Sequence, residues 1–128
     1  MIKELVNYVE EVTTDLRVGV GMFSDTYNEA VVLNWKGGIQ PTNSIGKYES
    51  YQRRPFLQII VRSESFDNAD TQAYNIFKHM EKLHGEYGGE YIISCIQSGE
   101  VLNRGRDTKN RWEFLMNFTL RIQTKQEE

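Results

Sequence analysis

The stretch that decides the fold is WEFLMNFTLRI, residues 112–122. Every even-numbered residue in it is apolar, and the odd-numbered residues are mostly polar. Because successive side chains of a β-strand point to opposite faces, this alternation predicts a strand with one apolar and one polar face. Such a strand is typical of an antiparallel sheet that is covered on one side only. The apolar face therefore requires a packing partner elsewhere in the chain.

Two amphipathic segments can provide that cover. Residues 2–16 place apolar side chains three or four positions apart, which forms one stripe along a helix. Residues 67–84 show the same spacing. We expect Asp67 or Asn68 to cap this second helix and Gly85 to end it in a left-handed conformation.

Four further segments read as strands, and they are RVGVG (17–21), AVVLNW (30–35), PFLQIIVRS (55–63) and YIISCIQS (91–98). Together the segments predict a single α+β domain, 1–128, in the order helix-strand-strand-strand-helix-strand-strand. The sheet is expected to be mostly antiparallel, with both helices packed on one face. Residues 36–54 show no periodicity and are expected to form a long loop, and residues 124–128, TKQEE, a frayed tail.

The composition limits the class of function. The net charge is −3, which argues against non-specific binding of nucleic acid but allows a local basic patch. Cys95 is the only cysteine, so no internal disulfide can form, and we expect it to be a small buried side chain. No apolar run approaches the roughly 20 residues that span a bilayer. We expect a soluble, unprocessed chain with no membrane partner.

The sequence offers no pattern of catalytic, cofactor-binding or metal-binding residues. His79 and His84 are five positions apart, so they do not share a helix face as paired zinc ligands do. The glycine pairs lack the spacing of a phosphate-binding loop. We therefore expect no enzyme and no cofactor. A small cytoplasmic enzyme or ligand-binding domain stays as an alternative, because an active site can assemble from residues far apart in sequence.

Two groups of basic residues stand out. One ends the expected loop, and the other lies in SGEVLNRGRDTKNR, residues 98–111, where Glu100 and Asp107 are the only acids. The second group can be a charged hairpin tip that keeps a sheet edge soluble, a nucleic-acid surface or a protein interface. The candidate interface residues are Arg53, Arg54, Arg104, Arg106, Asp107, Lys109 and Arg111.

The run QSGEVLNRGRDTKNRWEFLMNFTLRI, residues 97–122, resembles the C-terminal hairpin of the tail-terminator proteins of long-tailed bacteriophages, often called minor capsid proteins. The matching features are Ser98-Gly99, Gly105-Arg106-Asp107, Arg111 before an aromatic residue, and Asn117-Phe118. RPFLQIIVRS (54–63) and DNADTQAYNIFKHMEKLHG (67–85) occupy the places of that family's third strand and second helix. The resemblance is specific over residues 54–122, and the 36–54 loop matches nothing in it.

The resemblance implies a structural virion protein that forms a homohexameric ring. Such a ring caps the tail tube, joins it to the head connector, and lets DNA pass without binding it specifically. It is assembled in the host cytoplasm and resides at the head–tail junction. Free copies are either assembled already or monomeric, with long loops that order on contact. A head-closure or connector adaptor also forms a ring and is the main alternative.

A closed ring needs a heterologous interface, in which one patch meets a different patch of the next copy. We expect residues 99–111 and 36–54 to contribute to it. Asp107 is expected to pair with an arginine of its own hairpin or of a neighbouring copy.

Overall fold

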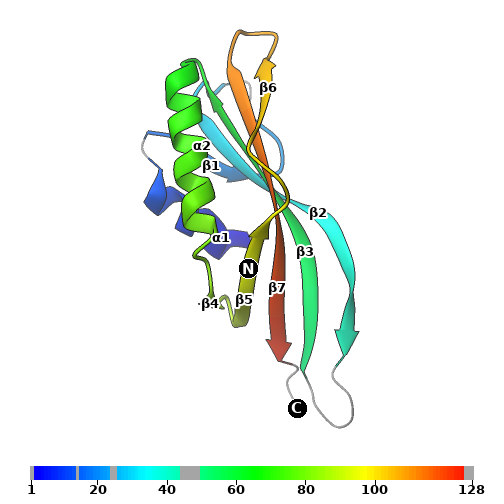
Figure 1. Cartoon of the computed structure of the whole chain (residues 1–128). Coiled ribbons are helices and arrows are strands. Elements are labelled where there is room, and N and C mark those ends of the chain that lie inside the picture. Colours follow the sequence, from blue (N-terminus) through cyan, green and yellow to red (C-terminus); the bar gives the residue numbers. More distant parts are fainter. Residues whose placement is uncertain (1, 14, 24–25, 44–49, 126–128) are drawn as a thin grey trace.

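The computed structural model describes residues 2–13, 15–23, 26–43 and 50–125 of the chain. Its elements, labelled in Figure 1, are α1 (Ile2–Val12), β1 (Arg17–Val20), β2 (Ala30–Asn43), β3 (Ser50–Ser63), α2 (Phe66–Met80), β4 (Gly85–Tyr87), β5 (Glu90–Gln97), β6 (Leu102–Arg106) and β7 (Trp112–Lys125). Two helices and one large sheet confirm the α+β class.

The seven strands form one sheet in the order β1-β2-β3-β7-β5-β4, and β6 also pairs with β7. β1 and β2 are parallel, and the other pairings are antiparallel. β7 therefore lies in the centre. It pairs with β3 on one side, while β6 and β5 follow one another along its other side.

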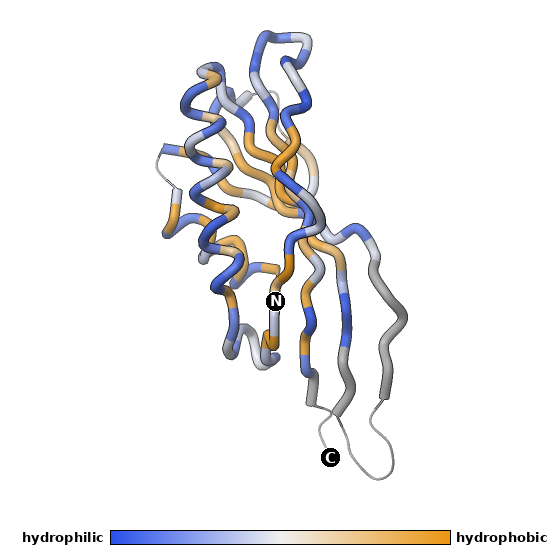
Figure 2. The backbone as a smooth tube through the Cα atoms, in the orientation of Figure 1, coloured by the Kyte–Doolittle hydropathy of each residue, from blue (hydrophilic) through white to orange (hydrophobic). Residues whose placement is uncertain are grey.

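The alternation of residues 112–122 is confirmed. Phe114, Met116, Phe118, Leu120 and Ile122 are buried, whereas Arg121 on the opposite face is exposed. Apolar side chains from both helices join the same core, among them Leu5, Val9, Ala69, Ala73, Ile76 and Met80. Figure 2 shows the apolar segments gathered where the strands pass beside α2. Burying one large apolar side chain in such a core stabilises the fold by about 1.5–3 kcal/mol.

The expected loop at residues 36–54 is largely wrong. β2 continues to Asn43 and β3 begins at Ser50, so the two strands extend together away from α2 (Figure 1). Their register shifts between Trp35 and Gly38 and again between Ile39 and Thr42. Each shift interrupts the period of two, which is why the sequence shows no strand pattern here. Residues 44–49 lie outside the described residues.

Both helices end earlier than their periodicity predicts. α1 stops at Val12, although Leu16 still packs partly buried against the core. α2 stops at Met80, where the N–H of Leu83 donates to the Met80 carbonyl at 3.1 Å and Leu83 enters the core at 2% exposed. Leu83 is buried in the turn that follows the helix, and its spacing from Met80 made this turn look helical in the sequence. Gly85, with φ of 118°, does not end the helix but opens β4.

The N-cap of α2 is also one that the sequence did not predict. The Ser65 hydroxyl accepts a hydrogen bond from the N–H of Asn68 at 3.3 Å, so the helix begins at Phe66 rather than after Asp67 or Asn68. Asp67 lies in the first turn instead, where its negative charge still suits the positive end of the helix dipole.

Two short strands were not expected. β4 and β5 are joined through Gly88 and Gly89, whose φ angles of 57° and 79° are those of a tight hairpin turn. β6 pairs with the first residues of β7, with a register shift between Asn103 and Arg106. The expected frayed tail is wrong for residues 124–125, which belong to β7, and residues 126–128 lie outside the described residues.

Candidate functional site

The turn between β6 and β7 is shaped by one carboxylate. Asp107 Oδ1 accepts hydrogen bonds from the backbone N–H groups of Lys109 and Arg111, each at 2.9 Å. The Asp107 N–H donates to the Arg111 carbonyl at 2.9 Å, and Asn110 adopts the left-handed conformation with φ of 61°. Asp and Asn favour turns of this kind because their short side chains bond to nearby backbone groups. The turn is therefore ordered by its own residues.

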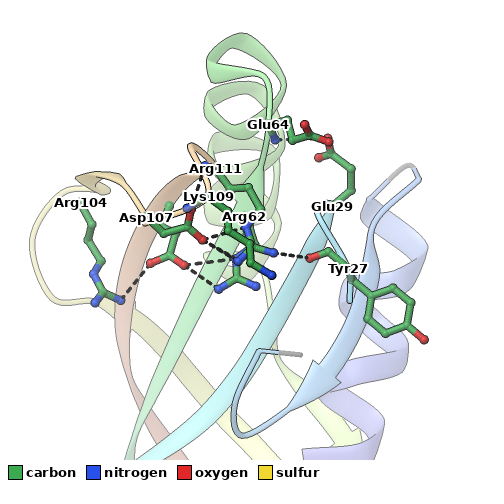
Figure 3. A network of polar contacts seen from close by, with 9 residues as sticks. Tyr27, Glu29, Arg62, Glu64, Arg104, Asp107, Lys109 and Arg111 are labelled. Carbon is green, nitrogen blue, oxygen red and sulfur yellow. Dashed lines mark hydrogen bonds and ion pairs between the residues drawn. The ribbon is translucent and has the colours of Figure 1, made fainter. Parts of the chain in front are cut away.

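Arg111 lies beneath this turn and is only 2% exposed. Its Nε and Nη2 atoms each lie 2.8 Å from Asp107 Oδ2. Its Nη1 donates to the Tyr27 carbonyl at 3.4 Å, which links the turn to the segment before β2 (Figure 3). A buried guanidinium is tolerated because its N–H groups have carboxylate and carbonyl partners.

A second arginine and carboxylate pair lies beside the first. Arg62 on β3 is in register with Glu113 on β7, and Arg62 Nη2 lies 3.0 Å from Glu113 Oε2. Arg62 Nε lies 3.7 Å from Asp107 Oδ2, and its guanidinium stacks 3.9 Å from the centre of the Phe23 ring. Arg104 Nη1 approaches Glu113 Oε1 at 3.8 Å from the exposed side. We call these five charged residues the tip network: Arg62, Arg104, Asp107, Arg111 and Glu113.

The tip network keeps Asp107 ionised. Burial raises the pKa of Asp107, but hydrogen bonds from the backbone of Arg111 and Lys109 and from the Arg111 guanidinium outweigh it, and the pKa is lowered overall. A carboxylate held in this way is a fixed negative charge. It is poorly suited to release and take up protons near neutral pH, as a general acid would do.

The tip network borders an open hollow of about 520 Å³. Four arginines and two carboxylates are among its lining residues, which leaves an excess of two positive charges. The side chain of Arg104 is 45% exposed at its rim, whereas Arg62 and Arg111 are buried at its base. The hollow can therefore recognise an anionic group. Arg62 and Arg111 are held in place, and Arg104 is accessible to a partner.

The structure divides the seven predicted interface residues between two places. Arg104, Asp107 and Arg111 belong to the tip network, and Asp107 pairs within its own hairpin, one of the two pairings expected. The guanidinium of Arg106 lies 5.4 Å from the centre of the Trp112 ring. Lys109 contributes its backbone N–H, and its side chain is exposed.

Arg53 and Arg54 lie near the other end of β3. Arg53 is in register with Ile122, whereas Ser63 is in register with Trp112 at the tip. Ten residues of strand separate the two places by about 33 Å. Arg53 forms an ion pair with Glu90, with Nη2 lying 2.8 Å from Oε2, and Arg54 is exposed. This separation of the two groups along β3 could not be predicted from the sequence alone.

Sequence reasoning missed Arg62, Glu113, Phe23, Tyr27 and Glu90. Arg62 directly follows an apolar strand segment, and a cation there is a signal that it needs a partner. The partner could not be named, because the register between β3 and β7 sets it and cannot be read from either strand alone.

Other kinds of site find little support in the described part of the chain. Within it, no group of three or more His, Cys, Asp or Glu side chains lies together as a metal site would require. Cys95 is 6% exposed, and burial raises the pKa of its thiol to about 12, in line with the prediction of a small buried side chain. None of the helices described is both long and apolar enough to span a membrane.

The comparison with known families agrees with the resemblance seen in the sequence. The model of a family described as "Bacteriophage tail terminator protein" matches residues 12–124. That range contains α2, all five residues of the tip network and the whole sheet except Lys125, the last residue of β7. No curated protein matches the chain. Since the family model covers most of its 128 residues, the chain belongs to the bacteriophage tail terminator protein family.

Proposed function

We propose that this protein assembles as a homohexameric ring on the end of the phage tail tube, stops its growth and joins it to the head connector. The observation that carries the proposal is the family match over residues 12–124, which includes every strand of the sheet apart from the last residue of β7. Copies are made and assembled in the host cytoplasm and then reside at the head–tail junction of the virion. The role is structural and uses no cofactor.

The geometry of the tip network supports an assembly role. Arg111 and Asp107 hold one another and fix the β6–β7 turn before any partner arrives. Binding then loses less conformational entropy than it would with a loop that orders on contact. Arginine and carboxylate groups of fixed geometry also give directional contacts, which a ring needs in order to repeat one interface with the same angle.

The overall charge fits the passage of DNA through such a ring. The chain has a net charge of −3. Retention of DNA requires a surplus of cations that displaces its counterions. A ring of acidic copies would therefore let DNA pass without specific binding.

Electron microscopy of the protein mixed with purified tail tubes of its own phage tests the proposal. We expect one ring at one end of each tube, and we expect tubes to stop lengthening when tube subunits are added afterwards. Tubes without the protein are the control and should keep growing. Binding to DNA-filled heads while tube ends stay bare would contradict the proposal and favour a head-closure adaptor.

A further inference from the structure

Among the hollows that the described residues form, two are opposite in charge. The first is the basic hollow at the tip, lined by Arg62, Arg104, Arg106, Asp107, Arg111 and Glu113 among others. The second is a hollow of about 370 Å³ between α1 and β4, which we call the acidic hollow and which is lined by Glu4, Asn7, Tyr8, Glu11 and Tyr87. Among these five residues are two carboxylates and no basic side chain. The amino terminus and Lys3 lower the pKa of Glu4 and offset part of its charge, so Glu11 is the carboxylate that carries the negative charge of this hollow to the surface.

The acidic hollow has firmly placed walls. The Tyr8 hydroxyl donates to the His79 carbonyl at 2.7 Å, which ties α1 to α2. The rings of Tyr8 and Tyr87 meet edge to face with centroids 6.4 Å apart, which ties α1 to β4. Glu11 is exposed at its rim. Its carboxylate is therefore accessible to a cation from outside.

One copy cannot bring its own two hollows together. The basic hollow adjoins Trp112 at the start of β7, because Arg106 pairs with that residue. The acidic hollow adjoins Tyr87, whose partner strand β5 begins beside Gln123 near the end of β7. Eleven residues of strand separate Trp112 from Gln123, which corresponds to about 36 Å. A contact between the two hollows therefore requires two copies.

We propose that the basic hollow of one copy receives the acidic surface between α1 and β4 of the next copy. The inference rests on the proposed ring and specifies its interface. Two different patches that complement one another form a heterologous contact, which closes into a ring when its rotation allows. Arg104 is the accessible cation at the rim of the basic hollow, and Glu11 is the accessible carboxylate of the acidic one. Such complementary charges fix the register of two partners and reject wrong ones.

Charge reversal tests the proposal. We expect Arg104→Glu alone and Glu11→Arg alone each to weaken association between copies by about tenfold or more, because like charges then face one another. The double variant Arg104→Glu/Glu11→Arg should recover association to near the wild-type level, since both partners are reversed. A mixture of the two single variants should also recover it. Association is measured both as chemical cross-linking in concentrated solution and as rings on tail-tube ends in electron micrographs.

Lys78→Glu is the matched control. It makes the same change of charge as Arg104→Glu on the exposed side of α2, outside both hollows, and we expect it to associate like the wild type. Thermal melts of all variants check that they fold, as expected for substitutions at exposed positions.

Single variants that associate like the wild type would overturn the proposal. A loss of association in the single variants that neither the double variant nor the mixture restores would also overturn it. Loss of tube binding with unchanged cross-linking would assign the basic hollow to the tail tube instead. Salt-sensitive retention of DNA by the wild type that Arg104→Glu removes, with cross-linking unchanged, would assign it to nucleic acid. Failure of the wild-type protein to cap tubes would instead contradict the proposed function, whatever the variants do.

Discussion

At the scale of the residue, the carboxylate of Asp107 joins the backbone of the β6–β7 turn to a buried charge. One oxygen accepts two backbone N–H groups, and the other faces the guanidinium of Arg111. Arg111 is 2% exposed, so its charge depends on this partner. Loss of one member of a buried pair is costly because the other is left unpaired away from water.

We therefore expect Asp107→Asn to lower the free energy of unfolding by about 3 kcal/mol, because the buried Arg111 loses its countercharge. Urea unfolding followed by circular dichroism measures the change. Thr108→Ala, at the exposed neighbouring position, is the control and should stay within about 0.5 kcal/mol of the wild type. Equal stability of Asp107→Asn and the wild type would mean that the pair contributes nothing.

The lowered pKa of Asp107 also predicts how stability depends on pH. The unfolded chain binds a proton near the ordinary pKa of 3.8, whereas the folded chain resists it to lower pH. The stabilisation is therefore fully present well above that value and is lost as pH falls through the lower pKa of the folded state. We expect the gap in unfolding free energy between the wild type and Asp107→Asn to be constant from pH 5 to 7 and to shrink below about pH 4. A gap that widens on acidification would show that the pKa is raised instead.

At the scale of the element, strands with a clear apolar pattern were predictable, whereas the bulged second half of β2 and the short strand β6 were not. Every even-numbered residue of 112–122 is apolar, and β7 lies where this pattern predicts. β2 contains two register shifts after Trp35, so its second half looked like a loop. β6 holds only five residues and includes Gly105 with φ of 86°. A short edge strand with a kink and two arginines among its five residues leaves no periodic signal.

The first residue of α2 also could not be predicted from the sequence. Ser65, Asp67 and Asn68 are all good N-cap residues, and the sequence does not rank them. The structure uses Ser65, and the Asn68 side chain instead donates to the Ser63 hydroxyl at 3.2 Å. The choice follows from where β3 ends, which is a tertiary constraint.

We expect Ser65→Ala to destabilise the protein by about 1 kcal/mol, because the N–H of Asn68 loses its partner. Asp67→Ala should cost less, about 0.5 kcal/mol, since it removes only a charge near the helix end. Thermal unfolding of both variants at neutral pH compares them. A larger loss for Asp67→Ala would place the cap where the sequence first suggested.

At the scale of the whole molecule, three segments far apart in sequence meet at the tip. Tyr27 precedes β2, Arg62 is the second-last residue of β3, and Asp107 with Arg111 spans the turn before β7. The sequence identified Arg104, Asp107 and Arg111 as a group because they are neighbours along the chain. Arg62 and Glu113 could not be predicted as members of the network, because only the pairing of β3 with β7 brings them together.

The same topology predicts an uneven distribution of stability. β3 and β7 have strands on both sides, whereas β1 and β4 lie at the ends of the sheet. We expect backbone amides of residues 57–61 and 114–120 to exchange with deuterium most slowly, and those of β1 and β4 much faster. Mass spectrometry of peptides from a dilute sample measures this. Protection of β4 as strong as that of β7 would indicate that an additional contact covers that edge.

The self-ordered turn between β6 and β7 has a consequence for timing. A surface that is already folded needs no ordering step before it docks, so diffusion and orientation set its association rate. In the proposed role, the protein competes with each incoming tube subunit for the same free end of the tube. Because its contact surface is already ordered, the result of this competition depends on the concentration of the protein and on how often it meets the tube end. The rate at which a loop folds does not enter.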